Sequence, residues 1–207
     1  MTLHSDALAV LTAWRAPTPA QDALRERYVA HLADHADGVF RSCRPDHLTA
    51  STLVMSADGS QVLLTLHAKA NRWFQFGGHL EPSDGSLLAA ATREATEESG
   101  LAGLALDQVP VQLSEHAVPF CGGVDDGLLV HHLDVRFLAV APPAAVHLVS
   151  EESLDVRWWP ADALPDPDAD LLELVALARE RLAQSTSASG SSPGGGSSLA
   201  AADQPSR

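Results

Sequence analysis

Apolar residues recur every three or four positions near the start of the sequence, as on one face of a helix. The clearest run is Leu24, Tyr28, Val29 and Leu32. Prolines at positions 17 and 19 interrupt the pattern. We therefore predict two helices, over residues 6–14 and about 18–33, within an N-terminal helical extension that covers residues 1–47.

The pattern changes from residue 48 onward, where β-branched and aliphatic residues form short runs typical of strands. The first two runs are separated by Ser56-Ala-Asp-Gly-Ser60, which indicates a hairpin. Helical spacing returns near residues 86–99 and 168–182, and a glycine turn is expected at Gly77-Gly78. Strands interspersed with helices predict an α/β domain over residues 48–183. The predicted strands cover residues 48–55, 61–66, 73–76, 109–116, 128–141 and 154–159.

The last part of the chain, residues 184–207, is mostly Ser, Gly, Ala and Pro. Such a segment has little apolar surface to bury, so folding cannot offset the entropy of ordering it. We predict a disordered tail without a catalytic role.

Composition adds a prediction about location. The chain is 45% hydrophobic and 19% charged, and its apolar runs are too short to span a bilayer. Its first residues lack the basic and apolar regions of a secretion signal, so we expect a soluble, cytoplasmic protein that does not enter the membrane. In that location Cys43 and Cys121 are expected to be reduced, partly buried thiols.

The strongly acidic balance limits the partners. A formal charge of −14 repels the backbone of DNA or RNA, so no nucleic-acid polymer is expected to bind. An acidic small molecule can still bind if a divalent cation lies between it and the protein. This possibility directs attention to groups of carboxylates.

Three glutamates are grouped in the predicted helix over residues 86–99. Glu94, Glu97 and Glu98 stand at positions i, i+3 and i+4, which puts them on one side of a helix. A hard cation compensates such crowding of like charge, and Mg²⁺ suits carboxylates together with substrate phosphates. Mn²⁺ is a second option.

The surroundings favour a site over the common alternative, a solvated acidic helix face. Leu88, Ala91 and Ala95 form an apolar stripe that would let the helix lie close to a sheet. Arg93 offers a planar fork that can orient a carboxylate. Gly-Gly precedes the loop before the helix, and Gly100 follows it as a stop signal.

This segment resembles the Nudix box, Gly-x5-Glu-x7-Arg-Glu-U-x-Glu-Glu-x-Gly-U with U aliphatic. The matching residues are Gly78, Arg93, Glu94, Ala95, Glu97, Glu98, Gly100 and Leu101. The resemblance implies a Nudix fold, in which helices sandwich a mixed β-sheet. It also implies a hydrolase with Mg²⁺ held by the three glutamates and the carbonyl of Gly78.

The sequence departs from the box at one place. Asp84 stands where the family has its first glutamate, and one additional residue separates Asp84 from Arg93. Asp84 could support the site by pairing with Arg93 or with a metal-bound water, or the role of that glutamate could be absent here. Asp84 could instead cap the following helix.

The resemblance implies that Mg²⁺ neutralises the diphosphate while a carboxylate takes a proton from the attacking water. The base in the family is a box glutamate or a glutamate in a later loop. Glu151 and Glu152, before the predicted strand at 154–159, suit the second option, and Glu152 is preferred.

Other residues give weaker signals for substrate binding. His132, Asp134 and Arg136 alternate on one face of a predicted strand, which either lines the substrate cleft or faces solvent. His79, in the box loop, either contacts a phosphate or is a tolerated loop residue. Trp158-Trp159 is expected to pack in the core.

Substrate identity stays open among nucleoside diphosphate derivatives and nucleoside triphosphates. The only tyrosine, Tyr28, lies upstream of the box, whereas the diadenosine polyphosphate branch has one downstream. Two alternatives remain: a Nudix-fold module that senses a nucleotide without cleaving it, and an isomerase with Cys121 as its acid. A homodimer is compatible with any of these functions.

Overall fold

The computed structural model describes residues 1–118, 121, 129–143, 145–149 and 153–189. Within these residues the chain forms four helices and eight strands. In chain order they are α1 (Leu3–Ala13), α2 (Pro19–Asp34), β1 (Asp46–Met55), β2 (Gln61–His67), β3 (Arg72–Phe74), β4 (Phe76–His79), α3 (Leu87–Ser99), β5 (Ala105–Leu106), β6 (Gln112–Ala117), β7 (His131–Val140), β8 (Ser153–Pro160) and α4 (Ala169–Ser189).

Strand β1 is the centre of a mixed sheet. It pairs in parallel with β7 along its whole length, from Asp46 opposite His131 to Met55 opposite Val140. On its other side β1 pairs antiparallel first with β4 and then with β2. Strands β5 and β6 pair with the far side of β7, and β3 and β8 pair with β2. The predicted mixed sheet and the hairpin between β1 and β2 are therefore confirmed.

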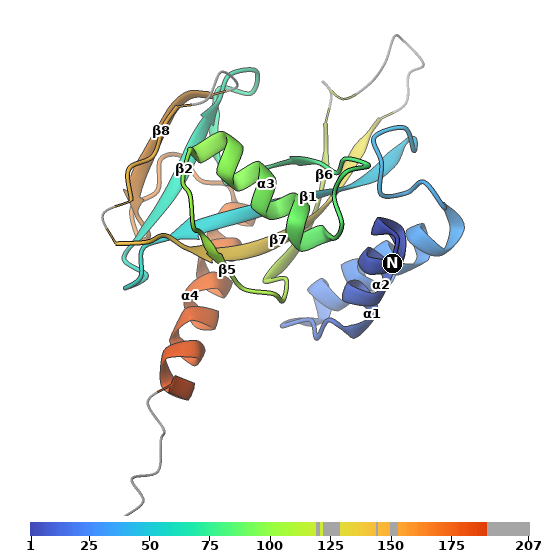
Figure 1. The fold of residues 1–207 in the computed structure, drawn as a ribbon, viewed down its shortest axis with the longest axis horizontal. Helices are drawn as coiled ribbons and strands as arrows, with labels where there is room; N and C mark the ends of the chain where they lie inside the picture. The colour runs from blue at the N-terminus through green and yellow to red at the C-terminus, as the bar shows by residue number, and fades with distance from the viewer. Residues whose placement is uncertain (119–120, 122–128, 144, 150–152, 190–207) are drawn as a thin grey trace, which may run out of the picture.

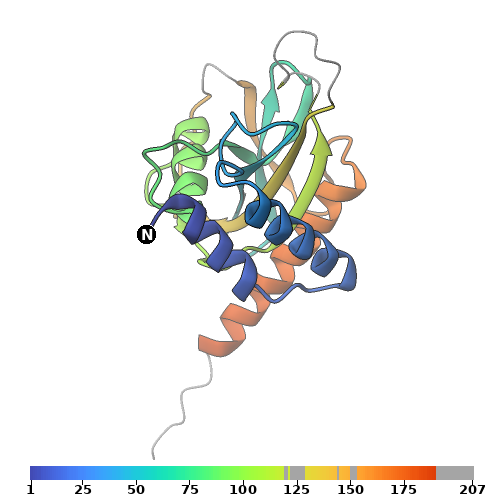
Figure 2. The same cartoon turned by 90° about the vertical axis from the view of Figure 1, so that its right-hand side faces the viewer.

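Helices cover both faces of this sheet, as Figures 1 and 2 show. On one face α3 packs its small Ala95 against Val54 and Phe76. On the opposite face α4 packs Leu174 and its neighbours against Leu53 and Leu64. The predicted α/β fold with helices on both sides of the sheet is confirmed, and we refer to these as the α3 face and the α4 face.

The two N-terminal helices pack against the sheet and α3. Leu11 of α1 and Tyr28 of α2 join the core that contains Leu133 and Val135 of β7. The carboxylate of Asp6 accepts a hydrogen bond of 2.8 Å from the backbone N–H of Leu87, in the first turn of α3. Because the first N–H groups of a helix have no partner within the helix, Asp6 supplies one.

The sequence and the structure differ at several elements. The predicted glycine turn at Gly77-Gly78 is wrong, because both residues lie in β4, and a Cβ on Gly77 would approach Ser51 Cβ to 2.3 Å. Glycine is needed there so that two strand backbones can lie close together. The short strand β5 was not predicted, and α4 continues to Ser189, beyond the predicted end at 182. Of the predicted tail, residues 190–207 lie outside the described residues.

Cys43 and Cys121 are both buried and free of disulfides. Among the described residues no helix is long and apolar enough to cross a membrane.

Candidate active site

Helix α3 is capped at both ends, at its start by Ser86, which was not predicted, and at its end by the predicted stop Gly100. Ser86 caps its start, accepting a hydrogen bond from the N–H of Ala89, and Gly100 ends it in the left-handed conformation. Ala91 and Ala95 are fully buried against the sheet. The hydroxyl of Thr52 donates to the carbonyl of Ala91 at 3.0 Å, so β1 fixes the middle of the helix. The helix therefore presents its polar side in a defined orientation.

The three glutamates of this polar side differ in exposure and contacts. The side chain of Glu97 is 61% exposed, whereas that of Glu94 is only 15% exposed. Glu98 accepts a hydrogen bond of 3.0 Å from the N–H of Gly77 in β4. The group thus extends from the edge of the sheet toward solvent.

Gly78 lies directly beside Glu94. A Cβ at position 78 would stand 2.8 Å from one carboxylate oxygen of Glu94 and 2.9 Å from the other. Any larger residue would displace this carboxylate, so glycine is required by the site rather than by a turn. Gly78 and Glu94 are therefore neighbours in space, and their binding of one metal ion stays a prediction.

Arg93 connects the carboxylates. Its Nη1 donates to Glu94 at 2.9 Å and to Glu97 at 3.2 Å. Its Nε and Nη2 donate to the two oxygens of Asp84 at 3.1 and 3.0 Å, and Nη2 also donates to the carbonyl of His79. The hydrogen bonds that Arg93 donates to Asp84, opposed by burial, raise the pKa of Arg93, which stays charged. One guanidinium therefore orients two helix carboxylates and the end of β4.

Asp84 performs the pairing role and not the capping role. Ser86 is the cap of α3, while Asp84 accepts from Arg93 and from the N–H of Glu81. Burial alone would raise the pKa of Asp84, but the hydrogen bonds from Arg93 and Glu81 outweigh it, and the net pKa lies below the usual value. Asp84 is thus an ionised partner that fixes Arg93.

The residues predicted to bind substrate lie on the other face of the sheet. In the pairing of β1 with β4, Ala50 is opposite Gly78 and Thr49 is opposite His79. Because neighbouring residues of a strand point to opposite faces, Gly78 lies on the α3 face and His79 on the α4 face. His132 is opposite His47, and Arg136 is opposite Ser51. His47 and Ser51 are each two residues from Thr49 along β1, so they lie on the same face as Thr49. The structure therefore separates His79, His132 and Arg136 from the glutamates by the thickness of the sheet.

Asp134 and Arg136 form a buried ion pair on the α4 face. Both are 3% exposed, so the solvent-facing alternative for this strand is excluded at these two positions. Asp134 accepts from Thr49, Ser51 and Arg136 at 3.0, 2.7 and 2.9 Å. Burial opposes ionisation of both groups, but their mutual attraction outweighs it, lowering the pKa of Asp134 and raising that of Arg136.

Arg136 also reaches two residues that the sequence pattern did not connect with it. Its Nη1 donates to Gln112 Oε1 at 2.8 Å and lies 2.7 Å from a carboxylate oxygen of Asp170 in α4. Ser51 in β1 and Gln112 in β6 are the residues opposite Arg136 on its two neighbouring strands. Alternation along each strand predicts which residues share a face, but only the strand order shows that these two lie beside Arg136. The arrangement ties α4 to the sheet.

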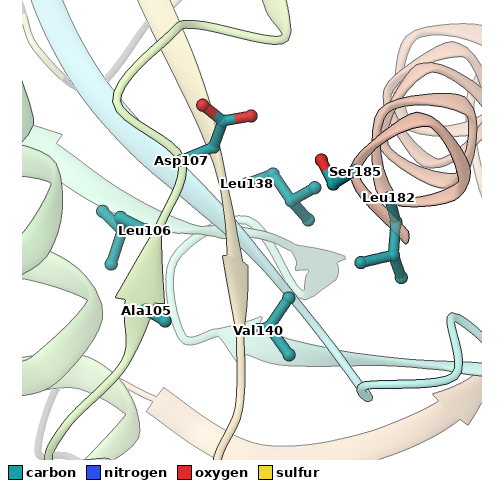
Figure 3. A pocket seen from close by; sticks show the side chains of 7 residues that line it. All are labelled: Ala105, Leu106, Asp107, Leu138, Val140, Leu182 and Ser185. Carbon is teal, nitrogen blue, oxygen red and sulfur yellow. The ribbon is translucent and has the colours of Figure 1, made fainter. Parts of the chain in front are cut away.

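The remaining residues named from the sequence are two loop glutamates and two tryptophans. Glu152 and Glu151 lie outside the described residues. Trp158 and Trp159 are both partly buried. Trp159 packs against the core beneath α4 with its ring 5.2 Å from that of Trp73, and Trp158 packs against the core on the α3 face. The hollow in Figure 3, about 280 Å³, lies between β5, β7 and the end of α4 and contains none of the predicted site residues.

The chain resembles known proteins in both sequence and fold. The sequence model of the NUDIX domain matches residues 45–180. Among curated protein sequences none matches this chain. Solved structures with the same fold include an Ap4A hydrolase of C. elegans, with a TM-score of 0.52 and 17% identity over 66% of this chain and 98% of that one.

Two further structures share the fold. The NUDIX domain of Shewanella oneidensis NrtR, solved with ADP ribose, has a TM-score of 0.51 and 23% identity over 74% of this chain and 97% of that one. The E. coli dihydroneopterin triphosphate pyrophosphohydrolase has a TM-score of 0.50 and 17% identity over 66% and 97%. The match to the domain, together with the braced glutamates on α3, shows that the chain belongs to the Nudix family and is a Nudix hydrolase.

Proposed function

We propose that this hydrolase cleaves the diphosphate linkage of a nucleoside diphosphate derivative or a nucleoside triphosphate, with Mg²⁺ as its metal and Mn²⁺ as a substitute. The observation that carries the proposal is the arrangement around Arg93, which holds Glu94 and Glu97 in place beside Gly78. A merely solvated acidic helix face would not need a buried Asp84 to fix the arginine.

The donor set fits Mg²⁺. Glu94, Glu97, Glu98 and the carbonyl of Gly78 all offer oxygen, the ligand that hard cations prefer. The space beside Gly78, which a Cβ would fill, leaves Glu94 in contact with the backbone of β4. Bound Mg²⁺ would neutralise the diphosphate and make a bound water more acidic.

The side chains of the protein would perform the remaining tasks. Asp84 and Arg93 hold two carboxylates in position before substrate arrives, which lowers the cost of organising the site. The general base is a box glutamate or Glu152, as in the sequence-based prediction. The exposure of Glu97 supports access from solvent to the box glutamates.

The three residues predicted to bind substrate lie on the α4 face, whereas the glutamates lie on the α3 face. A substrate that contacts both sets would have to extend around the edge of the sheet. His79 is the best placed of them, because its backbone carbonyl accepts from Arg93 while its side chain lies on the α4 face. Contact of His79, His132 or Arg136 with substrate stays a prediction, as do a cytoplasmic location and a homodimer.

The test is a screen of nucleoside diphosphate derivatives and nucleoside triphosphates with Mg²⁺, in which chromatography detects each product. Glu97→Gln serves as the inactive reference, and Glu180→Gln, an exposed change on α4, serves as the matched control. Turnover of at least one compound by the parent and the Glu180 variant, but not by the Glu97 variant, is expected. Tight binding of a nucleotide without turnover would instead support the sensing alternative.

A further inference from the structure

Three histidines and a cysteine come together on the α4 face, outside the proposed magnesium site. Their ligand atoms all lie within 4.8 Å of one another: one ring nitrogen each from His47, His79 and His132, and Sγ of Cys121. We propose that these four side chains bind a zinc ion.

Strand pairing creates this group from four distant parts of the sequence. His47 in β1 is opposite His132 in β7, and His79 in β4 is opposite Thr49, two residues along β1 from His47. The three rings pack with centroids 4.9 to 5.2 Å apart. Cys121 approaches from the connection between β6 and β7, with its backbone N–H donating to the carbonyl of Val118. The cluster is therefore built by the sheet.

The available nitrogens suit a metal. Nδ1 of His47 lies 3.3 Å from the backbone carbonyl of Cys43, which requires Nδ1 to carry the proton in a hydrogen bond. Nε2 of His47 then has a free electron pair, and it lies 3.7 Å from Cys121 Sγ. A histidine ligand commonly donates its second N–H to a backbone carbonyl in this way.

His132 gives an independent indication. Its Nε2 is buried and has no hydrogen-bond partner among the described residues. Buried polar atoms are nearly always paired, because an unpaired one loses its interactions with water without replacement. A metal ion within the cluster would supply the missing partner.

The distances agree with tetrahedral coordination. Zinc bonds of about 2.0–2.1 Å to nitrogen and about 2.3 Å to sulfur place a nitrogen and a sulfur ligand about 3.6 Å apart. Cys121 Sγ lies 3.2 Å from His79 Nε2 and 3.7 Å from His47 Nε2, on either side of that value. All the ligand atoms lie within 4.8 Å of one another. Zinc binding would therefore require the longer separations to shorten and the 3.2 Å separation between His79 Nε2 and Cys121 Sγ to lengthen slightly.

The chemistry separates this site from the glutamates. Nitrogen and thiolate ligands favour zinc, whereas Mg²⁺ takes oxygen ligands. Four ligands from the protein fill a tetrahedral zinc and leave no position for substrate, so the ion is structural. It fixes β4 through His79, whose neighbour Gly78 lies on the other face beside Glu94. Binding displaces the thiol proton of Cys121 to solvent.

Tag-free protein, stripped with a chelator and reloaded, tests the proposal. Elemental analysis should find about one zinc per chain, and Co²⁺ in its place should give the near-ultraviolet charge-transfer absorption of a cobalt–thiolate bond. Cys121→Ser should abolish that absorption, and His132→Gln should weaken zinc binding at least about 100-fold, since even outer contacts of a metal ligand change affinity 10–100-fold. Melting temperature is recorded for every variant.

Two control variants locate the ion. His116→Gln removes a ring that packs 5.6 Å from that of His132 but is not one of the four ligands, and it should keep the cobalt absorption. Cys43→Ser should keep it too, although Cys43 lies in a second group with His35 and Asp37. Loss of the absorption in Cys43→Ser with retention in Cys121→Ser would overturn the assignment.

Wild-type protein alone gives a further test that does not depend on the folding of variants. Zinc should slow alkylation of Cys121 compared with the stripped protein, as read by mass spectrometry of the peptides. A wild-type chain that takes up no zinc, shows no cobalt–thiolate absorption and alkylates Cys121 equally in both forms would refute the proposal.

Discussion

The two faces of the central sheet hold polar groups of different kinds. On the α3 face, carboxylates on one helix are oriented by Arg93 and extend to solvent at Glu97. On the α4 face, Asp134 and Arg136 are buried with hydroxyl and amide partners, next to the histidines. A solvated set of oxygen ligands suits catalysis with a substrate, whereas a buried and fully paired network suits stability. Substitutions on the α3 face are thus expected to lower turnover, and those on the α4 face to lower stability.

The largest effect is expected from Asp134→Ala, which leaves Arg136 with less compensation and deprives Thr49 and Ser51 of their acceptor. Loss of one partner of a buried ion pair lowers the free energy of unfolding by about 3–5 kcal/mol. Urea unfolding measures it, with the exposed change Asp162→Ala as control. A loss below about 1 kcal/mol would show that the buried ion pair does not stabilise the fold.

Glu98→Gln should lower activity without lowering stability, the opposite of Asp134→Ala. Loss of a proposed metal ligand should lower kcat at least about 100-fold. The glutamine oxygen can still accept from the N–H of Gly77, so the melting temperature should stay near that of the parent. Steady-state kinetics at saturating Mg²⁺ gives kcat, and near-parental turnover would show that Glu98 holds no metal.

Asp84→Asn sharpens the comparison further, because it changes a residue that contacts Arg93 rather than a proposed metal ligand. Asparagine presents one N–H₂ group to a guanidinium that has no acceptor, so one of the two hydrogen bonds is lost. We expect kcat to fall about 10–100-fold together with apparent Mg²⁺ affinity.

Ser86→Ala serves as the matched control for Asp84→Asn. It removes the cap of α3 and should lower stability by about 1 kcal/mol with little change in turnover. Equal kinetics in the parent and Asp84→Asn would mean that Arg93 is positioned without Asp84.

A smaller effect than at Asp134 is expected at Asp6, which connects the N-terminal helices to the α3 face. Asp6→Ala leaves the buried N–H of Leu87 without its acceptor and should lower stability by about 1–3 kcal/mol. Asp6→Asn, which retains an oxygen acceptor, should restore most of this. Thermal unfolding compares the two variants, and equal losses would indicate that packing rather than the hydrogen bond is responsible.

The two faces also differ in how far the sequence predicts them. Glu94, Glu97 and Glu98 lie within five positions on one helix, so helical spacing alone predicts that they share a side. The pairing of Asp84 with Arg93 is also local, because the two residues are nine positions apart. Local spacing therefore predicts which side chains gather on the α3 face, whereas their binding of a metal stays a prediction.

The α4 face depends on strand order instead. Alternation predicted that His132, Asp134 and Arg136 share a face, but not whether that face is buried. The two hydroxyl partners of Asp134 come from β1, 83 and 85 positions earlier, and only the parallel pairing of β1 with β7 brings them to Asp134. The turn predicted at Gly77-Gly78 is wrong because glycine allows a close approach of two backbones as readily as a turn.

The most direct test of the catalytic account is the dependence of turnover on Mg²⁺. The parent enzyme, prepared metal-free and then loaded with zinc alone, should show no hydrolysis of its best substrate, and Mg²⁺ should restore activity. Mg²⁺ should activate the parent enzyme in a saturable manner, and Glu98→Gln should lose this activation. Undiminished hydrolysis in excess chelator, with no response to added Mg²⁺, would contradict it.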